Sequence, residues 1–252
     1  MKKTVLDHVA IGTRTLADGW DLFGGLLGGT WAYGGDSPGY WWGQLEFASG
    51  PKIELLTPTG GPDSAFLERF LASRGAGPHH FNFIVGDITE TLGRVTALGI
   101  EPVQVNLQNP NWKEAFLHPK SAYGVVVQIA EQSGPSPRPG APAELPPPGP
   151  SSAFTLVELH VHDLDGAVGL FAGALAGDVV SRDNTGGTSA AELTWPNGAR
   201  LRLAQAVAGP EDVSAGVGRL DFIRATGPFS PEELGVAADL SKRLGVVLQL
   251  GG

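Results

Sequence analysis

The sequence contains no cysteine among its 252 residues, and it has a single methionine. The absence of cysteine excludes disulfide bonds and metal sites built from thiolates. The chain also lacks a basic excess, because 17 Lys and Arg stand against 26 Asp and Glu for a formal net charge of -9. No basic field would attract phosphates, so neither nucleic acid nor a membrane surface is expected as a partner.

Long apolar runs are absent too, since no stretch approaches the about 20 residues that span a bilayer. The first apolar segment, in MKKTVLDHVAIG, is short and interrupted by Asp7 and His8. We therefore expect a cytoplasmic protein rather than a signal peptide here. The hydrophobic content of 42% suits a globular core, and the length is enough for two ordinary domains.

The first sixty residues predict the order β-α-β-β-β. Apolar residues at helical spacing predict a helix over 16–27 that ends at Gly28-Gly29. Alternating patterns predict strands over 5–11, 31–33, 40–48 and 52–56, with a loop at GGDSPG. A connecting helix with a Phe and Leu stripe follows, and then the pattern restarts. The second module has predicted strands over 80–85, 102–105, 114–117 and 125–129, and a helix over 88–98 capped by Asp87.

A proline-rich segment divides the chain. Residues 133–153 hold eight of the 20 prolines, and such a sequence forms an extended spacer rather than a packed core. We therefore predict a domain over 1–132, a linker over 133–153 and a second domain over 154–252.

The second half repeats the first. Residues 6–56 align without gaps on 154–204, at an offset of 154 − 6 = 148, and LFGGLLGG falls on LFAGALAG. A fourth module starts near Arg219, with a helix opened by Ser230 and Pro231. Because the sequence stops after GVVLQL, its last two strands are expected to be missing.

Four polar residues share one face of the predicted strands. Successive side chains of a strand point to opposite faces, and the apolar ones must meet the helix. By this count His8, Glu54, His80 and Gln128 all point away from the helices. Trp42, Gln44 and Glu46 point the same way.

Paired modules with these motifs resemble the vicinal oxygen chelate superfamily, which includes glyoxalase I, extradiol dioxygenases and bleomycin-binding resistance proteins. LDHVAIGT, KIELLTP, GPHHFNF and AFLHPKSAYGVVVQIA are most similar to the methylmalonyl-CoA epimerase branch. The resemblance implies an α+β fold of tandem βαβββ modules, two paired in the N-terminal half and two degenerate ones in the C-terminal half.

It also implies a divalent metal ion held by His8, Glu54, His80 and Gln128. Two imidazoles and two oxygen donors suit Zn, Ni, Co, Mn or Fe(II). A metal with two positions left for substrate would stabilise an enolate as a nearby base removes a proton. The resemblance thus implies an isomerase, epimerase or lyase that acts on a small carbonyl compound.

The sequence departs from the epimerases at the proton-transferring position. Those enzymes have an acidic residue where this chain has Gln44, and an amide cannot act as a general base. Glu46 lies two residues further on the same face and is the candidate base, with Gln44 as a substrate contact. Gln128 replaces the usual last glutamate.

Aromatic residues near the predicted cleft suggest a flat or apolar substrate. The predicted substrate contacts are Tyr40, Trp41, Trp42 and Trp112. Two alternatives stay open: a binding protein that sequesters an antibiotic-like compound by stacking, and an Fe(II) extradiol-type dioxygenase. The protein is expected to be a monomer or a homodimer.

The repeated half has lost the predicted ligands. At the offset of 148, Leu156 replaces His8 and Arg202 replaces Glu54, and Arg219 stands near the place of His80. Glu158 shares the inner face with the two arginines, so we expect ion pairs to fill this cavity.

Overall fold

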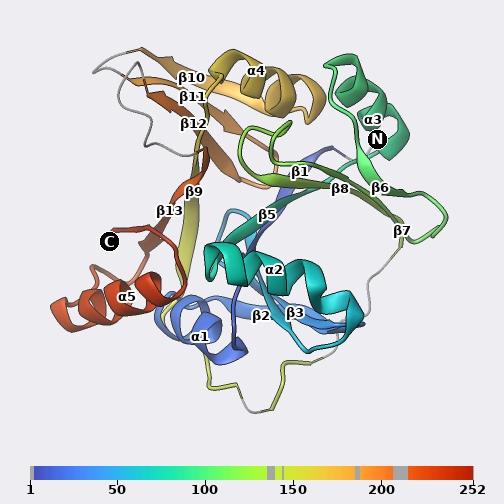
Figure 1. The fold of residues 1–252 in the computed structure, drawn as a ribbon. Helices are drawn as coiled ribbons and strands as arrows, with labels where there is room; N and C mark the ends of the chain where they lie inside the picture. The colour runs from blue at the N-terminus through green and yellow to red at the C-terminus, as the bar shows by residue number, and fades with distance from the viewer. Residues whose placement is uncertain (1–2, 135–139, 144, 185–187, 207–214, 252) are drawn as a thin grey trace. The chain divides into compact units, whose positions relative to one another are not determined.

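A computed structural model describes residues 3–134, 140–143, 145–184, 188–206 and 215–251 (Figure 1). The predicted linker over 133–153 lies partly outside the described residues. Within the described ranges, every helix falls short of the length and apolar character that crossing a membrane requires.

The predicted modules are all present. The first consists of β1 (Val5–Gly12), α1 (Leu16–Trp20), η1 (Asp21–Leu26), β2 (Thr30–Ser37), β3 (Tyr40–Glu46) and β4 (Lys52–Pro58). After η2 (Pro62–Ser64) and α2 (Ala65–Arg74), the second consists of β5 (Gly77–Ile84), α3 (Ile88–Ala97), β6 (Val103–Asn106), β7 (Trp112–Leu117) and β8 (Val126–Gln132).

The second half of the chain holds the other two modules. The third consists of β9 (Ser152–His160), α4 (Leu164–Val168), η3 (Gly169–Ala174), β10 (Asp178–Asp183), β11 (Thr188–Thr194) and β12 (Arg200–Ala206). The fourth consists of β13 (Gly216–Arg224), α5 (Pro231–Arg243) and β14 (Leu248–Gly251).

The chain divides into two compact units that each combine parts of both halves. One unit comprises Met1–Asp7, His80–Pro135 and Leu156–Arg219, and so contains most of the second and third modules. The other comprises His8–His79, Ser136–Thr155 and Leu220–Gly252, and contains most of the first and fourth modules. The division into domains over 1–132 and 154–252 stays a prediction.

The internal repeat is confirmed element by element. The helix α4 starts 164 − 16 = 148 residues after α1, and η3 starts 169 − 21 = 148 residues after η1. The same offset relates β11 to β3 (188 − 40 = 148) and β12 to β4 (200 − 52 = 148). The first and third modules therefore share a backbone plan down to the bounds of single elements.

In both modules the helix changes from α to π winding, from α1 to η1 and from α4 to η3. The sequence predicted a single helix over 16–27 without this change. Leu27 N–H donates to Leu22 O at 2.9 Å, and Leu175 N–H donates to Leu170 O at 3.0 Å, both across five residues. Gly24 makes room in the first module, because a Cβ there would lie 2.8 Å from the Trp20 ring. The strand β2 is also longer than predicted. It continues through the expected loop to Ser37, which pairs with Tyr40.

In every module the first and last strands are parallel neighbours, as β1 and β4 show. In the fourth module, β14 pairs in parallel with β13. The strand that follows its helix therefore lies where the last strand of a module lies. The fourth module was predicted to lack its last two strands. Among the described residues, it instead lacks equivalents of the two antiparallel middle strands.

The connecting helix α2 covers part of the sheet face that was expected to be free of helices. Its buried Leu67 and Leu71 form a cluster with Ala10 of β1 and Leu56 of β4. Figure 1 shows α2 lying over the strands of the first module. The apolar stripe of α2 has to be buried, and Ala10 and Leu56 share the face of His8 and Glu54. The helix thus packs beside the positions of His8 and Glu54 on these two strands.

The N-terminus of α5 has a capping box that allows a test of the fourth module. Ser230 Oγ accepts from Glu233 N–H at 3.2 Å, and Glu233 Oε2 accepts from Ser230 N–H at 2.7 Å. We expect Ser230→Ala to lower the free energy of unfolding by about 1 kcal/mol, measured by urea denaturation. Ser73→Ala, at an exposed serine near the end of α2, is the control. Equal effects of the two substitutions would contradict the capping role.

Candidate metal centre

The first module holds a buried cluster of His8, Gln44 and Glu54. Gln44 Nε2 donates to Glu54 Oε2 at 2.7 Å and lies 3.2 Å from His8 Nδ1. His8 Nε2 is 3.5 Å from Glu54 Oε1. Their exposed fractions are 2%, 2% and 7%. One imidazole nitrogen and one carboxylate oxygen therefore converge in a site shielded from water.

The strand pairing explains this convergence. Gln44 lies directly opposite Glu54 in the antiparallel pair of β3 and β4, and Glu54 lies opposite Ala10 in the parallel pair of β1 and β4. Opposite residues point to the same face, and His8 is two residues before Ala10. The predicted inward face of these residues is therefore confirmed.

Gln44 has a second polar atom that matters for binding. Among the described residues, its Oε1 has no hydrogen-bond partner although the atom is buried. Leaving a buried acceptor unpaired costs on the order of 1–3 kcal/mol. A bound molecule with an N–H or O–H group would satisfy it.

The second module presents a matching row of polar side chains. Asn82 Nδ2 donates to Gln128 Oε1 at 2.8 Å, and Gln128 Nε2 donates to Glu114 Oε2 at 2.8 Å. Trp112 Nε1 donates to the same carboxylate oxygen at 2.9 Å. Asn82 is fully buried. His80 precedes it by two residues in β5, so the two side chains share a face.

The two modules thus each pair one carboxylate with one carboxamide. In the first module the carboxylate is on the last strand (Glu54) and the amide is on the strand before it (Gln44). In the second module the order is reversed, because Gln128 is on β8 and Glu114 is on β7. In both, the amide nitrogen donates to the carboxylate.

His8, Glu54 and His80 could together hold a metal ion. Each offers one ligand atom, these atoms lie within 4.8 Å of one another, and all three side chains are buried. Two imidazoles and a carboxylate form a donor set suited to a borderline divalent ion. These three residues therefore fit the divalent metal ion that the family resemblance implies.

His79, next to His80, has a different environment. Its ring packs against Phe70 and Phe66 of α2, at centroid distances of 4.9 and 5.6 Å. Burial lowers the pKa of His79 from 6.5 to about 4, and the nearby charge of Glu54 opposes this shift. His79 is therefore a neutral residue that anchors α2.

Glu46, the predicted base, lies at the end of β3 and is exposed. Its carboxylate makes no hydrogen bond or ion pair with any described residue, in contrast to the buried Gln44 and Glu54. It is accessible to a substrate, but it is not part of the buried cluster.

The predicted aromatic contacts are partly buried. Tyr40 and Trp42 pack against the apolar cluster beneath α2. Trp41 lies against Trp31 with a centroid distance of 5.7 Å. Trp112 is bound to Glu114. At least Tyr40 and Trp42 therefore have a structural role beside the predicted contact with substrate.

Glu114 is the polar residue that the sequence analysis missed. The sequence predicts a strand at Glu114, and its parity with Trp112 is the signal that places it on the inner face. Its contact with Gln128 depends on a diagonal across β7 and β8, because Gln128 lies opposite Phe116. Strand boundaries alone do not give that register.

The third module replaces the ligands with the ion pairs that were expected. Glu158 Oε2 is 3.4 Å from Arg202 Nε and 3.5 Å from Arg219 Nη2. Glu158 Oε1 is 3.1 Å from His160 Nε2. The acidic residue is therefore neutralised by side chains from its own unit.

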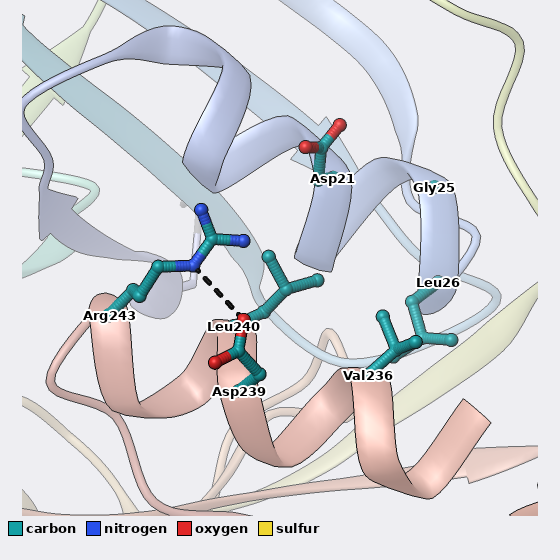
Figure 2. Close-up of a pocket in the computed structure, with 7 residues that line it drawn as sticks. All are labelled: Asp21, Gly25, Leu26, Val236, Asp239, Leu240 and Arg243. Atoms are coloured by element: carbon teal, nitrogen blue, oxygen red, sulfur yellow. Dashed lines mark ion pairs between the residues drawn. The ribbon is translucent and has the colours of Figure 1, made fainter. Parts of the chain in front are cut away.

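A separate surface pocket lies between η1 and α5 (Figure 2). Its lining combines Leu26, Val236 and Leu240 with charged groups, and Arg243 Nε lies 3.4 Å from Asp239 Oδ2. None of the predicted site residues lines this pocket.

Comparisons with known proteins bear on the family and the fold. Residues 7–116 match the family model of the Glyoxalase/Bleomycin resistance protein/Dioxygenase superfamily. No curated protein matches the sequence. A mutant of 4-hydroxymandelate synthase from Streptomyces coelicolor is 15% identical with a TM-score of 0.63, over 96% of this chain and 76% of that chain.

Two smaller solved structures are similar to about half of the chain. Hypothetical protein BH1468 from Bacillus halodurans C-125 is 28% identical with a TM-score of 0.47, over 54% of this chain and 100% of that chain. Methylmalonyl-CoA epimerase from Mycobacterium tuberculosis is 26% identical with a TM-score of 0.44, over 53% of this chain and 94% of that chain.

Residues 7–116 therefore form a region that belongs to the glyoxalase, bleomycin resistance and dioxygenase superfamily. The likeness to the synthase shows the same fold over nearly the whole chain. The predicted α+β class with βαβββ modules is confirmed.

The lowered pKa of His79 predicts a pH dependence of stability. The His79 side chain takes up a proton near pH 6.5 in the unfolded chain but only near pH 4 in the folded chain. The free energy of unfolding therefore decreases as the pH is lowered from 6.5 to 4. We expect His79→Phe, which keeps the ring packing, to reduce this loss in urea titrations at pH 7 and pH 4.5. The control is the exposed His162, as His162→Phe. An unchanged pH slope for His79→Phe would contradict the assignment.

Proposed function

We propose that this protein is a divalent-metal-dependent enzyme that forms an enolate from a small carbonyl compound, as an isomerase, epimerase or lyase. The observation that carries the proposal is the buried convergence of His8, Glu54 and His80. Burying a carboxylate beside two imidazoles is costly without a cation, and three buried ligands suit a functional centre better than a structural core.

The protein ligands would be His8, Glu54, His80 and Gln128, with the metal identity among Zn, Ni, Co, Mn and Fe(II). A bound divalent ion would supply Lewis-acid stabilisation of the negative charge that develops on a carbonyl oxygen. A single carboxylate among the ligands leaves net positive charge at the centre, which favours an anionic intermediate.

The remaining residues have separate roles in this proposal. Gln44 binds Glu54 Oε2, which directs Glu54 Oε1 toward His8, and the Gln44 Oε1 atom is open to a donor on the substrate. Glu46 is the proton-transferring group at the exposed end of β3. Tyr40, Trp41, Trp42 and Trp112 contact the substrate.

A second candidate is a protein that binds a flat aromatic compound without turnover. The observation in its favour is that Gln44 occupies the acid position of the epimerases while Glu46 is exposed. The same metal centre and the same aromatic residues would then serve binding alone. The two candidates differ in whether a carbon-bound proton exchanges with solvent.

Metal content tests the centre directly. Protein purified without chelator should contain about one divalent ion per chain by elemental mass spectrometry. His8→Ala removes one of three buried ligands, so it should reduce this content at least about 10-fold while circular dichroism stays unchanged. His162→Ala is the control. The proposal would be excluded if the purified protein contained no metal and took up none when divalent ions were added.

Solvent deuterium exchange tests the chemistry. Candidate carbonyl compounds should exchange their α-proton in the presence of the metal-loaded protein, and Glu46→Gln should slow this about 100-fold or more. The exposed Glu101, as Glu101→Gln, is the matched control. Exchange that persists in Glu46→Gln would exclude Glu46 as the base, and tight binding without any exchange would favour the second candidate.

A further inference from the structure

The amide of Gln128 is held in one orientation by two neighbours in its own unit, Glu114 and Asn82. Glu114 Oε2 accepts from Gln128 Nε2 at 2.8 Å and from Trp112 Nε1 at 2.9 Å. An indole N–H can only donate, so the oxygen that it meets has to accept. The group opposite this carboxylate oxygen is therefore the NH₂ of Gln128.

The opposite end of the amide is fixed as well. Gln128 Oε1 accepts from Asn82 Nδ2 at 2.8 Å. Turning the Gln128 amide over would place oxygen against oxygen at Glu114 and NH₂ against NH₂ at Asn82. Both favourable contacts would become repulsive beside a fully buried residue, where such contacts are costly.

This orientation matters for metal binding. A divalent ion binds the oxygen of a carboxamide and not its NH₂ group. Oε1 has two lone pairs, and Asn82 uses one of them. We propose that Glu114 is a positioning residue: by binding the NH₂ group of Gln128, it keeps Oε1 presented as the fourth protein ligand. This inference rests on the proposed metal centre.

The first module supports this interpretation by its reversed order. There the carboxylate is the residue on the last strand, and Gln44 on the preceding strand donates to it at 2.7 Å. A carboxylate ligand presents oxygen in either orientation, so it needs no such selection. A carboxamide ligand needs its oxygen end to be selected, and Glu114 makes that selection by binding the NH₂ end. Groups that orient a ligand typically change metal affinity by about 10- to 100-fold.

The experiment measures Zn²⁺ binding by calorimetry to the chelator-treated full chain. Glu114→Gln can accept from the NH₂ group of the Gln128 amide or donate to its oxygen, so it no longer selects the orientation, and we expect the dissociation constant to rise about 10- to 100-fold. Glu101→Gln, an exposed change of the same kind, should leave it within about twofold.

The charge-conserving exchange Glu114→Gln with Gln128→Glu gives a rescue. It places the carboxylate on the last strand and the amide on the preceding one, as in the first module, so affinity should return at least to that of the unaltered protein. A merely structural role of Glu114 would not predict this return. Melting temperatures of the metal-free variants show whether each one folds.

Two outcomes separate the inference from the proposed function. If the unaltered protein binds Zn²⁺ and Glu114→Gln binds it equally well, or the double variant stays as weak as the single one, the positioning role is wrong and the metal centre stands. If the unaltered protein binds no Zn²⁺, the metal centre and the inference fail together.

Discussion

The burial of the Glu54 carboxylate is the constraint on which the rest of this site depends. An ionised carboxylate can be withdrawn from water only where donors or cations surround it. Here Gln44 lies opposite it on β3 and provides one strong hydrogen bond, and the imidazole of His8 approaches the other oxygen. These contacts need β3, β4 and β1 in one register, so the sheet itself creates the site.

Duplication explains why the rest of the chain has the same plan without the same chemistry. The third module keeps the element bounds of the first at a constant offset, but Arg202 stands where Glu54 would be. Its inner face is filled by ion pairs around Glu158. Packing preserves the backbone because helix and sheet still bury the same apolar positions, whereas the inner polar positions were free to change.

The predictions succeeded where a local rule decides the outcome. Alternation placed His8, Gln44 and Glu54 on one face, Asp87 was identified as the cap of α3, and turn residues marked the modules. They failed where distant contacts decide. The apolar stripe of α2 was expected, but not that it covers Ala10 and Leu56, and the π winding of η1 and η3 was not expected either.

The sequence by itself determined the modular fold, the inward direction of the four candidate ligands and the loss of those ligands in the repeat, because strand parity and a gap-free repeat are properties of residue order. Only the tertiary structure decided that Gln44 binds Glu54, that Glu46 is exposed and that Glu114 reaches Gln128. These depend on side-chain reach across neighbouring strands, and the register that sets such reach is fixed by the packing of the whole sheet.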